Sequence, residues 1–105
     1  MKKIIGVSAC PAGIAHTYMA AESIEIAAKK LGYEVKIETN GASGVENPLT
    51  DEDIQEAAAV IIAADTSVEI ERFRGKPLIE VSVGEAIRNA DEILKKVENS
   101  ELEVY

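Results

Sequence analysis

The sequence predicts an α/β protein built on a four-stranded parallel sheet with helices on both faces. Two segments, Lys3 to Ala9 and Ala58 to Ala64, are dominated by apolar residues, as expected of strands that are covered on both faces. Segments with helical spacing of apolar residues alternate with the strand-like segments along the chain. This alternation favours parallel strands joined by right-handed crossovers, so the two apolar strands belong in the middle of the sheet.

Length, charge and the rare residue types limit what the protein can be. At 105 residues the chain can build one hydrophobic core, so we expect one domain over residues 1–105. One cysteine excludes an internal disulfide, and with a single histidine it argues against a structural zinc site, so we expect no metal and no cofactor. The net charge of −8 argues against nucleic acid and anionic membranes as partners.

The sequence also indicates where the protein works. The start, Met1 to Lys3 followed by only a few apolar residues, is too short for a signal peptide. No stretch approaches the length of a membrane span. We therefore expect a soluble, cytoplasmic protein without direct insertion into the membrane.

A helix is predicted from about Thr17 to Leu31, after the first strand. Small and aliphatic residues form one stripe on it, namely Ala20, Ile24, Ala27, Ala28 and Leu31. Gly32 fits the left-handed position at which many helices end. The next segment, Tyr33 to Thr39, alternates apolar and charged residues, which predicts an edge strand with one face in solvent. Asn40 to Leu49 contains Gly, Asn and Pro and is expected to be a loop.

The middle of the chain is predicted to form a short helix and the second central strand. Thr50 can cap the helix, whose first turn, Asp51 to Asp53, complements the helix dipole. The apolar strand Ala58 to Ala64 ends at Asp65, on the same edge of the sheet as the loop after the first strand. Asp65 is a candidate proton acceptor there, although a cap for the turn that follows is the preferred interpretation.

The last third of the chain completes the sheet. The basic segment Arg72 to Pro77 precedes the fourth strand, Leu78 to Val81, which predicts a turn at the edge of the sheet where the strands begin. Ser82 with Glu85 forms a capping box that opens the last helix. The tail after Glu98 is expected to fray.

These elements give the strand order 2-1-3-4, a Rossmann-like arrangement. The order reverses between the first and third strands, and ligands in such sheets bind at this switch point, beyond the C-terminal ends of the strands. The segment Ser8 to Thr17, which follows the first strand, lies there. We therefore expect the active loop to follow the first strand.

The segment Ser8 to Thr17 contains the only cysteine and the only histidine of the chain. A loop that enters a helix points unpaired backbone N–H groups at one spot, beside the positive end of the helix dipole, and anions bind there. Because Pro11 has no N–H, the candidate phosphate-binding amides are those of the residues that follow it, Ala12, Gly13, Ile14, Ala15 and His16, and the hydroxyl of Thr17 is a further candidate contact. The amides would surround the sulfur of Cys10 and favour its nucleophilic thiolate form, which makes Cys10 the candidate catalytic residue.

The spacing of Cys10 and His16 indicates phosphoryl chemistry of a particular kind. A cysteine followed by five residues and an arginine is the phosphate loop of the cysteine phosphatases, and His16 stands at the arginine position. The loop has no Lys or Arg, so a phosphoryl group on Cys10 would lack the bidentate grip of an arginine. Weaker binding of the phosphoryl group by the loop suits a carrier, because a carrier must release that group to an acceptor. The alternatives are an inert Cys10 in a binding module and a purely local packing role for His16.

The segment Ile5 to Glu22 resembles the signature of the fructose-family enzyme IIB domains of the bacterial phosphoenolpyruvate-dependent sugar phosphotransferase system. The similarity continues in Val35 to Gly41, in Asn47 to Thr50 with Asp53 and Ile54, and in Arg72 to Lys76, so it spans most of the chain. The family usually has a glutamine where this chain has Asn40.

The resemblance implies a phosphoryl carrier in sugar uptake. Cys10 would accept a phosphoryl group from a phosphohistidine of the IIA domain and pass it to a sugar bound by the membrane-embedded IIC domain, through which the protein would be peripheral to the membrane. Fructose is the family's usual sugar. The second hypothesis is a low-molecular-weight phosphatase or an arsenate-reductase-like enzyme, which would share the loop but would need an arginine in place of His16. Dinucleotide and nucleotide loops are excluded because Gly-x-Gly-x-x-Gly and Gly-Lys-Ser/Thr are absent.

Overall fold

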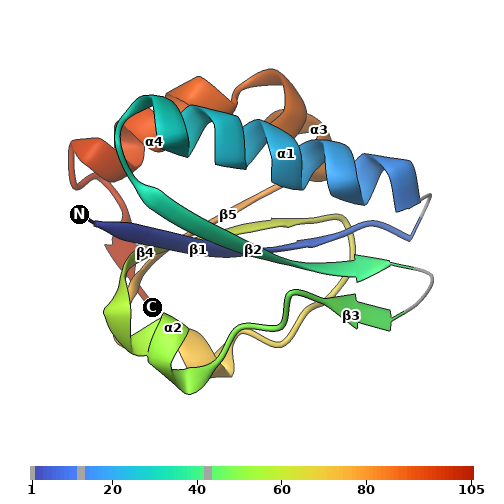
Figure 1. Cartoon of the computed structure of the whole chain (residues 1–105), viewed down its shortest axis with the longest axis horizontal. Coiled ribbons are helices and arrows are strands. Elements are labelled where there is room, and N and C mark those ends of the chain that lie inside the picture. The colour runs from blue at the N-terminus through green and yellow to red at the C-terminus, as the bar shows by residue number, and fades with distance from the viewer. Residues whose placement is uncertain (1, 12–13, 42–43) are drawn as a thin grey trace.

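The structure, a computed structural model, describes residues 2–11, 14–41 and 44–105, and within them six strands form one sheet with helices on both faces (Figure 1). The strands are β1 (Lys3–Ala9), β2 (Glu34–Gly41), β3 (Gly44–Glu46), β4 (Ala57–Ala64), β5 (Pro77–Val81) and β6 (Glu103–Val104). The α-helices are α1 (Ile14–Lys30), α2 (Asp51–Glu56), α3 (Val83–Arg88) and α4 (Ala90–Glu98), and a 3₁₀ helix covers Glu71–Phe73.

The parallel centre of the sheet confirms the predicted fold. β1 pairs in parallel with β2 on one side and with β4 on the other, and β4 pairs in parallel with β5. The order β2-β1-β4-β5 is the predicted order 2-1-3-4, with the switch point between β1 and β4. The prediction of an all-parallel, four-stranded sheet is wrong at the edges, where β3 and β6 are added in antiparallel orientation.

Both added strands are too short to leave a periodic signal in the sequence. β3 lies within the segment predicted as a loop, and its Glu46 pairs with Thr39, so the C-terminal end of β2 is not a sheet edge. β6 lies in the tail that was expected to fray. It is held by the backbone of its neighbour, because the N–H of Tyr105 donates to the carbonyl of Lys76 and the N–H of Gly75 donates to the carbonyl of Tyr105.

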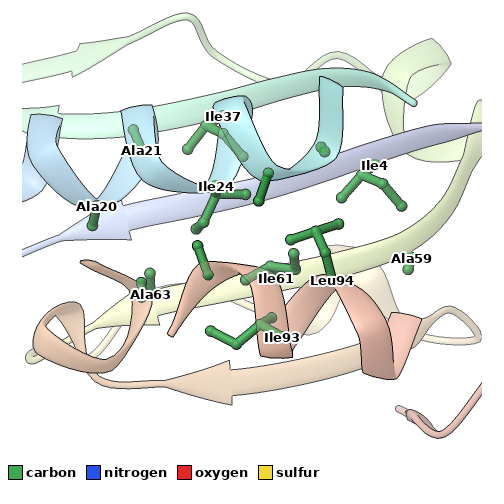
Figure 2. Close-up of a cluster of buried hydrophobic side chains, with 14 of the residues drawn as sticks. Ile4, Ala20, Ala21, Ile24, Ile37, Ala59, Ile61, Ala63, Ile93 and Leu94 are labelled. Atoms are coloured by element: carbon green, nitrogen blue, oxygen red, sulfur yellow. The ribbon is translucent and has the colours of Figure 1, made fainter. Parts of the chain in front are cut away.

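The hydrophobic core is divided into two clusters by the sheet. On one face, α1, α3 and α4 cover the side chains shown in Figure 2, where Ile24 of α1 lies among residues of β1, β2 and β4. On the other face, α2 and the 3₁₀ helix cover a smaller cluster that includes Ile5, Val60 and the fully buried Phe73. Because β1 and β4 contribute side chains to both clusters, the expectation that helices cover both faces is confirmed.

The ends of the helices follow local chemistry. Thr50 caps α2 as predicted, and it does so in a reciprocal capping box with Asp53. At the start of α3 the side chain of Ser82 accepts the N–H of Glu85, which is one half of the capping box predicted there. The predicted single last helix is two helices, because Asn89 leaves helical geometry at ψ 31° and separates α3 from α4. α1 begins at Ile14, earlier than the expected Thr17, which shortens the loop after Cys10.

The second face of β2 is covered, which corrects the prediction that it lies in solvent. Asp53 of α2 accepts hydrogen bonds from the ammonium groups of Lys3 on β1 and Lys36 on β2, each at 2.7 Å. Its carboxylate also accepts the N–H of Thr50 at 2.9 Å. Lys36 of β2 therefore fastens α2 to the sheet instead of facing water, whereas Glu34 at the start of the strand remains exposed.

Protein stability is expected to fall at acidic pH because of Asp53. Hydrogen bonds from Lys3 and Lys36 hold the pKa of this carboxyl far below its ordinary value. A carboxyl with a lowered folded-state pKa stabilises the protein above its unfolded pKa of about 4 and loses that contribution as the pH falls further. Urea unfolding at several pH values should show that Asp53→Asn removes much of the loss that wild type suffers between about pH 5 and pH 2.

The exposed Asp91 provides the matched control for this prediction. Its contact with Lys30 is long, at 3.6 Å, and both side chains are mostly exposed. Asp91→Asn makes the same chemical change but leaves the contacts of Asp53 with Lys3 and Lys36 intact. It should therefore leave the acid sensitivity of unfolding as in wild type. If the Asp53 and Asp91 variants were equally sensitive to acid, the contacts of Asp53 with Lys3 and Lys36 would not be the cause of the acid sensitivity.

Candidate active site

Cys10 lies directly after β1, at the edge of the sheet where the parallel strands end. Its side chain is half-buried and packs against the cluster on the α1 face. The next residue, Pro11, is exposed and begins the turn toward α1. The sulfur is therefore partly supported by the core while the next residue along the chain, Pro11, is exposed to solvent.

The other predicted site residues lie around the start of α1. Ala12 and Gly13 are outside the described residues, Ile14 is the first residue of α1, and Ala15 and His16 are exposed in its first turn. The first turn of α1 has no acidic residue, whereas α2, α3 and α4 each have at least one there. Acidic side chains normally complement the positive end of a helix, so their absence leaves this end of α1 available to an external anion.

Thr17 differs from its neighbours because it is fully buried. Its backbone carbonyl accepts a hydrogen bond from Ser8 Oγ at 2.8 Å, which ties the first turn of α1 to the end of β1. Its own hydroxyl has no hydrogen-bond partner among the described residues. The Ser8 contact fixes the start of α1 beside Cys10.

Asp65 joins the site from the end of β4, as sequence reasoning considered but did not prefer. Cys10 Sγ lies 3.9 Å from Asp65 Oδ2, in the geometry of a thiol that donates to a carboxylate. The other oxygen, Oδ1, accepts the N–H of Val83 at 3.1 Å. Asp65 thus does act as a cap, but for the start of α3 and not for the turn that follows it. The signal in the sequence was an acidic residue directly after a central strand adjacent to β1.

The β2–β3 hairpin is attached to α1 near the same edge. Tyr18 OH, in the second turn of α1, donates to Glu46 of β3, and this hydrogen bond raises the pKa of the tyrosine. Because Asn40 pairs in register with Ala9, the hairpin lies beside the strand end from which Cys10 emerges. The segment read as a loop therefore forms one side of the site.

Arg72 does not lie where its sequence context predicted. Its guanidinium binds the carboxylate of Glu38 through two hydrogen bonds, at 2.6 and 3.1 Å, on the face of the sheet opposite Cys10. Glu38 is buried and also accepts the N–H of Leu49. Burial opposes ionisation of Glu38, but the bonds from Arg72 and Leu49 outweigh it and lower its pKa. The residues of the basic segment thus have separate partners. Arg72 binds Glu38, whereas Lys76 donates to the backbone carbonyls of Gln55 and Ala57.

Two other features, a metal-binding group and a membrane-spanning helix, are absent from the part of the chain that the structure describes. Across residues 2–11, 14–41 and 44–105, His, Cys, Asp and Glu form no group of three or more that could hold a metal ion. In the same residues no helix is both long enough and apolar enough to cross a membrane.

Comparison with known proteins places this site in a family. The family model described as "PTS system, Lactose/Cellobiose specific IIB subunit" matches residues 5–96. The chain is 52% identical over 99 residues to the PTS system fructose-like EIIB component 2 of Escherichia coli strain K12, and the match covers 93% of each protein. It is 48% identical over 103 residues to the PTS system fructose-specific EIIABC component of Bacillus subtilis. That match covers 98% of this chain but 16% of the longer protein.

Solved structures agree with the sequence relatives. A domain of the fructose-specific IIABC component from Borrelia burgdorferi superposes with a TM-score of 0.93 at 46% identity, and the match covers 99% of this chain and 98% of that one. A thioredoxin-dependent arsenate reductase of Corynebacterium glutamicum is similar in fold alone, with a TM-score of 0.54 at 18% identity. With a family match over most of the chain, the protein belongs to the IIB family of the sugar phosphotransferase system and is a fructose-family IIB domain.

Proposed function

We propose that this chain is the phosphoryl carrier of a fructose-type sugar phosphotransferase system. Cys10 accepts a phosphoryl group from a phosphohistidine of a IIA domain and donates it to a sugar bound by a membrane IIC protein. The observation that supports this most is the position of Cys10, half-buried at the end of β1 beside the first turn of α1. That turn lacks acidic side chains and lies within the family match.

The first transfer exchanges one bond to phosphorus for another. The sulfur of Cys10 attacks the phosphorus in line, the S–P bond forms and the P–N bond breaks. The electron pair of the P–N bond stays on the departing imidazole, which takes up the proton that the thiol loses. Backbone amides of residues 12–16 stabilise the negative oxygens of the phosphoryl group, helped by the positive end of α1. His16, exposed in the first turn, orients or neutralises the group.

The second transfer returns the site to its starting state. A sugar hydroxyl attacks the same phosphorus, the S–P bond breaks and its electron pair stays on the sulfur. The proton lost by the sugar hydroxyl balances the one that Cys10 regains. No residue of the loop can form the bidentate arginine contact of a phosphatase, since position 16 is a histidine, and this favours release to an acceptor over hydrolysis.

Several parts of this proposal come from relatives and not from the geometry. The B. subtilis relative is named as a fructose-specific EIIABC component, which supports fructose as the sugar and A and C components as partners. Residues 1–105 would then act as one EIIB domain in the cytoplasm, bound to the membrane through IIC. A phosphatase or arsenate-reductase-like activity is the weaker hypothesis, because the arsenate reductase shares only the fold.

Intact-mass spectrometry after incubation with phosphoenolpyruvate, the general phosphotransferase proteins and a fructose-type IIA tests the proposal. We expect one phosphoryl adduct that peptide mapping places on Cys10 and that iodine, which cleaves S–P bonds, removes. Absence of the adduct would contradict the proposal. If no adduct formed and the protein hydrolysed p-nitrophenyl phosphate, the phosphatase hypothesis would replace the carrier proposal.

A further inference from the structure

The carboxylate of Asp65 lies beside the sulfur of Cys10, and in a phosphoryl carrier this position has an energetic consequence. From this contact we infer that Asp65 keeps the phosphoryl group on Cys10 at a high transfer potential, so that the group passes readily to the sugar. The inference rests on the proposed function, because it concerns the phosphorylated form of Cys10. It assigns Asp65 as a positioning and charge-setting residue of the transfer, in addition to its hydrogen bond with the first residue of α3.

Three contacts fix Asp65 in place. Its N–H donates to the carbonyl of Ala9 at 3.1 Å, which holds its backbone against the residue that precedes Cys10. Its Oδ1 accepts the N–H of Val83 at 3.1 Å, and its Oδ2 lies 3.9 Å from Cys10 Sγ. With one carboxylate oxygen bound to the start of α3, the side chain cannot turn away from the sulfur without losing that bond. The negative charge is therefore held next to the reacting atom.

The charge acts differently on the two states of Cys10. In the free protein the thiol donates to Oδ2, which is a favourable contact. In the phosphorylated protein the thiol proton is gone and a group with about two negative charges stands near the carboxylate, which is unfavourable. The segment from Ser8 to Thr17 contains no Lys or Arg that could offset this repulsion.

Delivery to the sugar removes the repulsion and restores the hydrogen bond. When the S–P bond breaks, its electron pair stays on the sulfur and the sugar oxygen takes the phosphoryl group. The sulfur then gains the proton that the sugar hydroxyl has lost and becomes a thiol again. That thiol again donates to Asp65. The carboxylate thus raises the free energy of the phosphorylated carrier relative to the unphosphorylated one, and this difference drives the forward transfer.

The variant Asp65→Asn isolates the charge from the structural role. The asparagine oxygen can still accept the N–H of Val83, so the cap of α3 is retained while the negative charge is lost. The readout is the equilibrium constant for phosphoryl exchange between IIA and this protein, measured by intact mass. We expect the variant to hold the phosphoryl group about three- to tenfold more strongly at low salt, and to deliver it to sugar more slowly. The difference from wild type should shrink as salt is added, which loss of a structural cap would not produce.

Ser82→Ala is the matched control. It removes the side-chain cap of α3, in which Ser82 Oγ accepts the N–H of Glu85 at 3.1 Å, but leaves the charge beside Cys10. Its exchange constant should equal that of wild type. An unchanged constant in Asp65→Asn, with wild type phosphorylated on Cys10, would overturn this inference alone. Absence of phosphorylation in wild type would overturn the proposed function and this inference with it.

Discussion

Replacement of Cys10 by serine is expected to leave the fold intact and to abolish the iodine-sensitive phosphoryl adduct. Serine is close in size to cysteine, and the half-buried sulfur is at the rim of the core, so the unfolding midpoint should change little. The hydroxyl is a far weaker nucleophile at neutral pH than a thiol, and phosphoryl transfer from IIA should fall by at least about a thousandfold. This loss is measured by quenching the phosphorylation reaction at several times and determining the phosphorylated fraction by intact-mass spectrometry.

Ser67→Ala serves as the control for the Cys10 substitution. Ser67 is exposed at the same edge of the sheet, and its loss changes a side chain there without removing the thiol. Its adduct should form at the wild-type rate and should be removed by iodine. Rapid formation of an adduct on the Cys10→Ser protein would show that another residue carries the phosphoryl group.

The sequence was sufficient for the parallel centre of the sheet because that part depends on local patterns. The unbroken apolar segments of β1 and β4 must be covered on both faces, and the handedness of crossovers leaves few orders for them. Helix caps such as Thr50 and the left-handed Gly32 are set by residues next to them in the chain. The same reasoning placed Cys10 at the switch point.

Contacts between distant segments could not be predicted in the same way. The strand order placed Asp65 at the same sheet edge as Cys10, but the contact of the two side chains depends on the register that pairs Ala9 with Ala64, and no local pattern fixes a register between strands so far apart in sequence. Likewise, the alternation in β2 suggested that Glu38 faces solvent. The chain between β4 and β5 instead crosses that face and brings Arg72 to it, so a charged residue is buried with its partner.

Substitution of Gly6 by alanine is expected to destabilise the protein by about 3 kcal/mol, a large effect for one methyl group. Gly6 lies in the middle of β1, between Ile37 of β2 and Ile61 of β4. A Cβ there would lie 2.4 Å from the carbonyl oxygen of Ile61 and 3.0 Å from Cδ1 of Ile37. The oxygen belongs to the backbone of a paired strand, so the clash can be relieved only by moving strands that define the position of Cys10. Urea unfolding gives the change in free energy.

Gly84→Ala makes the same chemical change with the opposite expected sign. A Cβ at Gly84 would approach only the guanidinium end of Arg88, at 3.0 Å, and that flexible side chain can move away. Because Gly84 lies within α3, alanine should be neutral or should stabilise the protein by up to about 1 kcal/mol through its higher helix propensity. If Gly6→Ala also left the free energy of unfolding unchanged, β1 and β4 could move apart without loss of stability. The tight β1–β4 pairing that holds Cys10 beside Asp65 would then not be the rigid support that the proposed transfer requires.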